Sequence, residues 1–180
     1  RYAYRFWPCM NPSGYAAGER ANAEGFDVNR SFGRGGETPE ARAIVTANRD
    51  RKFALSIDLH EDCDAEGFYC YEYGGEELGS AVVSAVAARG FPLQNFEGGY
   101  DIGAPLAAEH IRFRRGHVLP DAVAERAAIG GFSYNLAIVR HAAPRALTFE
   151  TPSRLPWEQR IAMHVAAVET AIAALSAGPA

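Results

Sequence analysis

Five short stretches of the chain carry residue types that could do chemistry together. In chain order they are Asn11-Pro12-Ser13-Gly14-Tyr15, Arg20, Asp27-Val28-Asn29-Arg30, Asp58-Leu59-His60-Glu61 and Thr148-Phe149-Glu150-Thr151-Pro152. An imidazole can bind a metal ion, a carboxylate can take a proton from water, and a guanidinium can stabilise an oxyanion or grip a carboxylate through two hydrogen bonds. These groups together could hydrolyse an amide whose substrate carries a free carboxylate.

Each stretch also has an ordinary structural explanation. Asn-Pro followed by Gly forms a turn without any function, and Arg20 in a polar loop is usually solvated. His60 could be a hydrogen-bonded histidine at the end of a strand, and Glu150 an exposed edge residue. A solvated loop would explain the acidic residues Glu61, Asp62, Asp64 and Glu66.

Two predicted strands position the central pair. Apolar and polar residues alternate over residues 53–60, which predicts a strand that presents Asp58 and His60 on one face at its carboxyl end. A second short strand, at 146–150, ends at Glu150. Strand ends of this kind border the ligand crevice in open α/β sheets. We therefore expect His60 and Glu150 to meet across a shared divalent cation.

Strand and helix patterns alternate along the whole chain, which predicts an α/β domain with a mixed, mostly parallel sheet flanked by helices. The expected elements are strands at 53–60, 67–73 and 146–150 and helices at 39–50, 76–89, 121–129 and 156–176. Residues 11–36 are rich in Gly and Asn and are expected to form a loop. The pattern weakens over residues 91–134.

Composition describes a single domain with its own core. The chain has 180 residues, of which 48% are hydrophobic and 22% charged, and its net charge is −4. No run of Lys or Arg suits nucleic acid, and polar residues interrupt the apolar stretches at 81–88 and 165–175, so we expect neither nucleic acid nor a membrane as partner. Three cysteines at spacings that suit no disulfide framework favour a reducing, cytoplasmic compartment.

The ordered set of motifs resembles the M14 zinc carboxypeptidases and their deacylase relatives, the succinylglutamate desuccinylase and aspartoacylase group. Those proteins show Asn-Pro-x-Gly-Tyr, a following arginine, Asp-x-Asn-Arg, a zinc histidine at a strand end, and Thr-Phe-Glu. The corresponding stretches keep this order here over residues 11–152. The resemblance implies a zinc carboxypeptidase-like fold and zinc-dependent hydrolysis of an amide next to a free carboxylate, in a peptide or an N-acyl amino acid.

The resemblance also implies a role for each matched residue. His60 would be a zinc ligand and Glu150 the general base. Arg20 would polarise the scissile carbonyl together with zinc. Asn29 and Arg30 would hold the carboxylate of the substrate.

Three other residues are less directly matched. Tyr134 is nearest to the mobile tyrosine of the family's peptidases and would then be a substrate-binding residue, although its spacing does not match well and Tyr100 is a rival. Asp58 either supports His60, as in the deacylase branch with its Asp-Leu-His motif, or is a plain buried acid. His164 lies beside the apolar stripe of the last helix and is expected to be a packing residue.

The chain departs from the family in its metal ligands. The family's other zinc ligands come from a His-x-x-Glu element upstream of Asn-Pro-x-Gly-Tyr, and the five histidines here show no such spacing. Only ten residues precede Asn11, so we expect residues 1–180 to be one catalytic domain that lacks its N-terminal portion. The alternatives are a zinc-dependent deacylase of N-acyl amino acids and a metal-free module that binds carboxylates through Arg20 and Arg30.

Overall fold

A computed structural model of the protein describes residues 2–33, 36–96, 111–121 and 133–177. The strands are β1 (Ser56–Asp62), β2 (Tyr69–Tyr73), β3 (Ile111–Arg114), β4 (His117–Pro120) and β5 (Ala146–Pro152). The helices are α1 (Pro12–Ala17), α2 (Pro39–Asn48), α3 (Glu77–Ala88), α5 (Tyr134–His141) and α6 (Trp157–Ala177), with a short 3-10 helix, η1 (Val28–Arg30).

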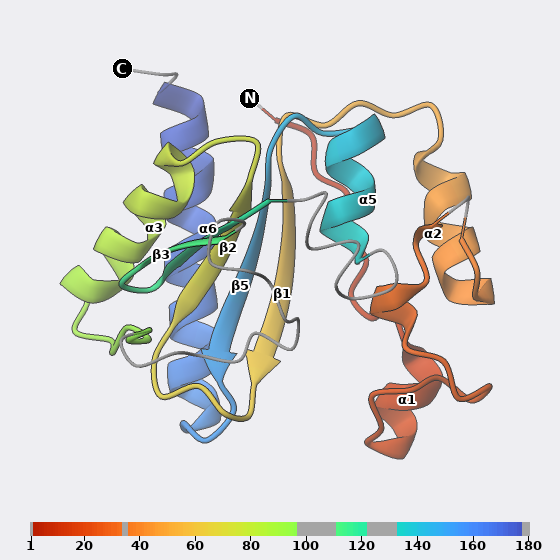
Figure 1. The fold of residues 1–180 in the computed structure, drawn as a ribbon, viewed down its shortest axis with the longest axis horizontal. Coiled ribbons are helices and arrows are strands. Elements are labelled where there is room, and N and C mark those ends of the chain that lie inside the picture. The colour runs from red at the N-terminus through yellow and green to blue at the C-terminus, as the bar shows by residue number, and fades with distance from the viewer. Residues whose placement is uncertain (1, 34–35, 97–110, 122–132, 178–180) are drawn as a thin grey trace.

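The strands form one five-stranded sheet in the order β1-β5-β2-β4-β3. Figure 1 shows α3 and α6 on one side of this sheet and α5 and α2 on the other. The pairs β1–β5 and β2–β4 are parallel, while β2–β5 and β3–β4 are antiparallel. The predicted α/β class with a mixed sheet flanked by helices is confirmed, and the antiparallel share of the sheet is larger than the sequence indicated.

The main core lies between the sheet and the pair α3 and α6. Its largest fully buried side chains include Phe68 from β2's flank, Leu147 and Phe149 from β5, and Met163 from α6. Each such side chain stabilises the fold by about 1.5–3 kcal/mol relative to exposure. Because Leu147 and Phe149 both point into this core, the intervening Thr148 and the following Glu150 face the opposite side of the sheet.

The last helix, α6, is long and apolar enough to meet the criterion for a membrane span by length and composition alone, with a mean hydropathy of 1.3 over its most apolar window. In the fold it packs against α3 and β5. Met163, Ala166, Ala167 and Ala171 are fully buried there.

The main predicted elements are confirmed with small shifts at their ends. The strands expected at 53–60, 67–73 and 146–150 correspond to β1, β2 and β5, and the helices expected at 39–50, 76–89 and 156–176 to α2, α3 and α6. The helix expected at 121–129 lies, beyond Asp121, outside the described residues. The loop expected at 11–36 contains α1 and η1.

Besides α1 and η1, three further elements were not predicted. The strands β3 and β4 have four residues each and are joined by a tight turn in which Gly116 has a φ of 68°. The Ile-Arg-Phe-Arg sequence of β3 alternates over four residues only, and Phe113 is exposed like Arg112 and Arg114, so the pattern is too short and too weakly buried to mark a strand. Helix α5 does have a start signal, because Ser133 accepts a hydrogen bond from the backbone N–H of Leu136 at 3.3 Å.

A buried polar residue fixes α5 on the sheet. The side-chain amide of Asn135 donates to the carbonyl of Leu147 at 2.9 Å and to the hydroxyl of Thr148 at 2.8 Å. Its oxygen accepts a hydrogen bond from Ser56 at 3.0 Å. Asn135 thus ties α5 to both β1 and β5, the two strands that carry His60 and Glu150.

A buried contact between a carboxylate and an imidazole fastens α3 to the other end of the sheet. Glu72 on β2 and His117 on β4 are 0% and 2% exposed, with Glu72 Oε2 at 3.0 Å from His117 Nε2. The same carboxylate oxygen accepts the backbone N–H of Gly79 in α3 at 2.8 Å. A side chain at position 79 would collide with both groups, so glycine permits the close approach of helix and sheet.

We predict that Glu72→Ala lowers the free energy of unfolding by about 3–5 kcal/mol, because it leaves a buried imidazole without its partner. The measurement is equilibrium unfolding in urea. The matched control is Glu77→Ala, in the first turn of α3, whose carboxylate is 75% exposed and 3.9 Å from Arg145; its effect should stay below about 1 kcal/mol. Equal effects of the two substitutions would contradict the role of the buried pair.

Candidate active site

The Asn-Pro-x-Gly stretch folds as a capped helix start beside the site. Asn11 accepts the backbone N–H of Gly14 at 3.0 Å, and Pro12 occupies the first helical position of α1. The Asn11 amide also donates to the carbonyl of Arg20 at 3.0 Å. A Cβ at Gly14 would collide with the Asn11 side chain and the carbonyl of Ala21. The motif therefore fixes the backbone on which Arg20 sits.

The Asp-x-Asn-Arg stretch is organised by its aspartate. Asp27 Oδ1 accepts the backbone N–H of Asn29 at 2.8 Å and so caps η1. Asp27 Oδ2 accepts the Nε–H of Arg20 at 2.9 Å, which pairs the two predicted anion-binding stretches. The Arg20 side chain remains 67% exposed, so its other N–H groups can reach a bound molecule.

The parallel pairing of β1 with β5 brings the central pair together. His60 and Glu150 are direct neighbours in register, on the face that α5 covers. His60 Nδ1 lies 4.0 Å from Glu150 Oε1, and the Glu150 side chain is only 13% exposed. The predicted proximity of these two groups is thus present, with room between them for a hydrogen-bonding or coordinating atom.

Asp58 supports His60 directly. Its Oδ2 lies 3.0 Å from His60 Nε2, and its side chain is 7% exposed. Burial lowers the pKa of His60, but the charge of Asp58, the hydrogen bond to it and the charge of Glu150 outweigh burial and raise this pKa to about 9. With Nε2 held by Asp58, Nδ1 is the ring nitrogen that faces Glu150. A carboxylate behind a histidine in this way fixes the tautomer of metal-binding imidazoles.

Burial also changes the acidity of Glu150. Loss of water contact raises its pKa to about 7, and the charges of Asp62 and Asp58 add to this, while the charge of His60 acts in the opposite direction. A carboxylate whose pKa lies near neutral pH can both accept and return a proton, as a general base requires.

Asn29 joins the loop stretches to the strands. Its side-chain nitrogen is 3.4 Å from His60 Nε2, and its side-chain oxygen accepts the backbone N–H of Tyr134 at 2.9 Å. Arg30 is half-buried and donates to the carbonyl of Asn29 at 3.1 Å. The structure thus brings His60, Glu150, Asn29 and Arg20 to one region, with Arg30 adjoining it.

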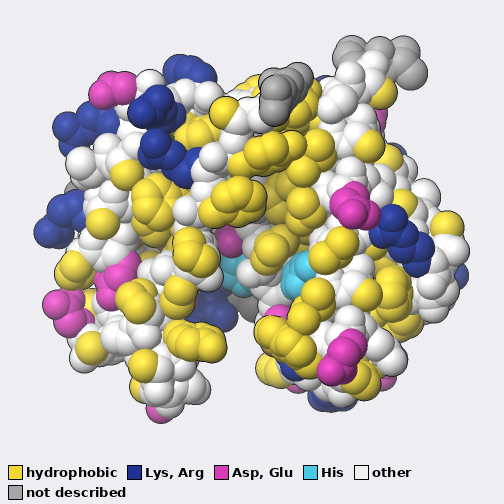
Figure 2. Space-filling view, turned by 180° about the vertical axis from the view of Figure 1, so that it is seen from behind, with side chains coloured by type: hydrophobic (Ala, Val, Ile, Leu, Met, Phe, Trp, Pro, Cys, Tyr) yellow, Lys and Arg dark blue, Asp and Glu magenta, His cyan; other side chains and the backbone are white. Residues whose placement is uncertain are grey.

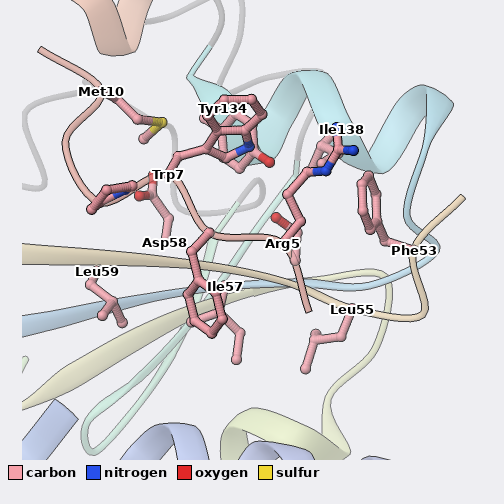
Figure 3. Close-up of a pocket in the computed structure, with 13 residues that line it drawn as sticks. Arg5, Trp7, Met10, Phe53, Leu55, Ile57, Asp58, Leu59, Tyr134 and Ile138 are labelled. Atoms are coloured by element: carbon pink, nitrogen blue, oxygen red, sulfur yellow. The ribbon is translucent and has the colours of Figure 1, made fainter. Parts of the chain in front are cut away.

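Two hollows adjoin these residues. One, of about 220 Å³, is lined by Arg20, Asn29, Asp58 and His60. A larger one, of about 520 Å³, lies between residues 5–10 and β1, and Figure 3 shows Asp58 and Tyr134 beside it. Figure 2 shows histidine and acidic side chains in the hollow at the centre of that face of the molecule.

The Tyr134 side chain packs against its neighbours and does not project over the two hollows. Its ring makes an edge contact with Phe32, with 5.3 Å between centroids, and it lines the larger hollow. Burial raises the pKa of its phenol. Its role as a substrate-binding residue stays a prediction. The rival, Tyr100, lies outside the described residues.

Four residues near the pair were not predicted to take part. Thr151 donates to the carbonyl of His60 at 3.4 Å and lies 3.3 Å from His164 Nε2. Burial lowers the pKa of His164 to about 4, so this imidazole is neutral at pH 7. His164 is therefore a polar support behind the site, as well as a packing residue. Asp62, expected in a solvated loop, ends β1 and accepts a hydrogen bond from Tyr69.

The fit to a metal ion rests on His60. His60 has the geometry of a metal ligand, because Asp58 holds its Nε2 and its Nδ1 faces Glu150. Within the described part of the chain, one group of three ligand side chains could share an ion: Asp62, Cys63 and Asp64. His60 is not in that group. Catalytic zinc sites use three protein ligands, and His60 has the features that one of them requires.

Comparisons with known proteins show the fold. No protein-family model and no curated protein matches the chain. Among solved structures, a candidate metallopeptidase from Shewanella amazonensis SB2B matches 93% of the chain with a TM-score of 0.67 and 23% identity. Candidate metallopeptidases from Shewanella denitrificans OS217 (TM-score 0.67, 22% identity) and Shewanella baltica OS155 (TM-score 0.65, 18% identity) each match 93% of it as well.

The chain spans 60–62% of the length of these three proteins. At these identities the likeness establishes the architecture alone. The chain therefore has a metallopeptidase-like α/β fold.

Proposed function

We propose that the protein is a zinc-dependent hydrolase that cleaves an amide bond next to a free carboxylate, in the manner of a metallocarboxypeptidase. The observation that carries this proposal is the pairing of His60 with Glu150, whose side chains face each other at 4.0 Å on neighbouring parallel strands. The metallopeptidase-like fold supports it. The motifs that resemble the M14 family give the residue roles.

His60 would hold the metal ion through Nδ1, with Asp58 fixing the ring from behind. A bound zinc ion acts as a Lewis acid that polarises a carbonyl and acidifies water. Binding requires a neutral imidazole, so it displaces the proton that Asp58 and Glu150 favour on His60.

Glu150 is the general base in this proposal. It takes a proton from the attacking water and returns it to the leaving amine. Burial outweighs the opposing charges of His60 and Arg20 and keeps the pKa of this carboxylate near neutral, which serves both steps.

The loop stretches bind the substrate. Arg20, exposed and oriented by Asp27, stabilises the negative charge that develops on the scissile carbonyl oxygen. Asn29 and Arg30 hold the substrate carboxylate by charge-assisted hydrogen bonds. The substrate is a peptide or an N-acyl amino acid with a free carboxylate.

A deacylase of N-acyl amino acids is the second candidate. The hollow beside His60 measures about 220 Å³, which is smaller than the roughly 300–1,000 Å³ of typical ligand pockets. A hollow of this size favours one amino acid over a longer peptide.

We predict that Glu150→Gln lowers turnover by roughly 100-fold or more, because the amide cannot accept the proton. Zinc binding should remain intact. The assay uses protein from the complete reading frame, with a peptide series and a set of N-acyl amino acids as substrates. Zinc content is measured by elemental analysis.

The control for this substitution is Glu158→Gln, an exposed glutamate in the first turn of α6. It should behave as the parent. Unimpaired turnover of Glu150→Gln would remove the general base from the proposal, and a parent protein without hydrolytic activity on either substrate class would remove the function.

A second prediction concerns the metal-free protein. The folded-state pKa of His60 is raised from 6.5 to about 9, so its stabilisation is fully present below pH 6.5 and is lost as the pH rises through 9. This linkage contributes up to roughly 3 kcal/mol to the free energy of unfolding. Asp58→Asn should remove most of it.

The measurement is urea unfolding in the presence of a chelator at pH 6.5 and pH 9, for the parent, Asp58→Asn and the exposed control Asp50→Asn. We expect the loss of stability between the two pH values to be smaller in Asp58→Asn than in the other two proteins. The same loss in all three would contradict the role of Asp58.

A further inference from the structure

Glu150 has a neighbour on β2, Tyr69, which lies in none of the sequence motifs. In the sheet order, β5 lies between β1 and β2. The register pairs His60 with Glu150 on one side and Tyr69 with Glu150 on the other. These three residues therefore form one row across three strands, on the same face of the sheet.

The side chain of Tyr69 reaches across the middle strand, β5. It donates a hydrogen bond of 2.7 Å to Oδ2 of Asp62 on β1, two residues beyond His60 and on the same face. Because Tyr69 lies opposite Glu150 and Asp62 lies opposite Pro152, the phenol ring and this bond must span β5 between the levels of these two residues. We call this link the Tyr69–Asp62 strap.

The strap is rigid. Tyr69 is 2% exposed, and its ring makes edge contacts with Tyr71 and Phe96, each at 5.6 Å between centroids. Asp62 is fixed as well, since its Oδ1 accepts the backbone N–H of Asp64 at 2.8 Å. Both ends of the hydrogen bond are therefore immobilised before any substrate binds.

Glu150 needs such a support. Among the described residues, its carboxylate has no hydrogen-bond donor, and His60 Nδ1 at 4.0 Å is its nearest charged partner. Directly opposed residues on paired strands have Cβ atoms about 4.5–5.5 Å apart, so the side chains of Tyr69 and Glu150 start next to each other on this face. Packing, and not hydrogen bonding, must then select the side-chain rotamer.

We propose that Tyr69 is a positioning residue, which through its hydrogen bond to Asp62 across β5 holds the carboxylate of Glu150 toward His60. This inference rests on the proposed function, in which Glu150 is the base. A displacement of about 1 Å at a reacting group can cost on the order of 100-fold in rate. The strap would thus act on the chemical step and not on substrate binding.

The test is Tyr69→Phe, which keeps the ring and removes the bond. We expect kcat to fall by roughly 10- to 100-fold with KM unchanged. In its crystal structure, the distance from the Glu150 carboxylate to His60 Nδ1 should exceed that of the parent. Tyr73→Phe, at the other end of β2 opposite Ala146, is the matched control. It should match the parent in kcat and in the distance from the Glu150 carboxylate to His60 Nδ1.

The partner residue supplies the second half of the test. Asp62→Asn retains an acceptor oxygen and should keep most of the rate, whereas Asp62→Ala should lose as much as Tyr69→Phe. The double variant Tyr69→Phe/Asp62→Ala should be no slower than either single variant, because all three lack the same bond.

Parent-like kcat and parent-like Glu150 geometry in Tyr69→Phe would overturn the proposal, and so would losses that multiply in the double variant. The crystallographic readout does not depend on turnover. If the parent protein has no hydrolytic activity, the proposed function fails, while the position of Glu150 in Tyr69→Phe still decides whether the strap holds it.

Discussion

The parallel pairing of β1 with β5 is the constraint on which the rest of the site depends. It sets His60 opposite Glu150, and a slip by one residue would turn either side chain to the other face of the sheet. Packing on the opposite face of the sheet fixes this register, since Leu147 and Phe149 are fully buried there in the core with α3 and α6. Core packing on one face therefore sets the geometry of His60 and Glu150 on the other.

The reactive face carries buried polar groups that cost free energy unless they are paired. The pairing runs along the sheet: Asp58 with His60, Asp62 with Tyr69, and Asn135 with Ser56 and Thr148. Glu150 is the member without a hydrogen-bond donor among the described residues, and burial raises its pKa. A buried group left unpaired amid satisfied neighbours is typical of a functional site rather than of a structural one.

The sequence predicted the strand half of this site well and the cross-strand supports poorly. Alternation over residues 53–60 and the short apolar run before Glu150 are local signals, and they sufficed for β1 and β5. The supporting side chains contact partners 7 to 79 residues away in the sequence, on other elements, and no local pattern encodes such contacts. These side chains are Tyr69, Asn135 and His164. Asp62 was assigned to a loop because its charge hid the continuing period of two.

The two halves of the site are held by different means, and α5 connects them. His60 and Glu150 are fixed by the sheet, whereas Arg20 and Asn29 are fixed by local caps at Asn11 and Asp27. At the start of α5, Tyr134 donates its backbone N–H to Asn29, while the next residue, Asn135, binds β1 and β5. Two adjacent residues of one helix thus grip the loop half and the strand half. The distance between the loops that carry Arg20 and Asn29 and the Glu150 carboxylate is therefore set by the packing of α5 on the sheet, and not by the loops themselves.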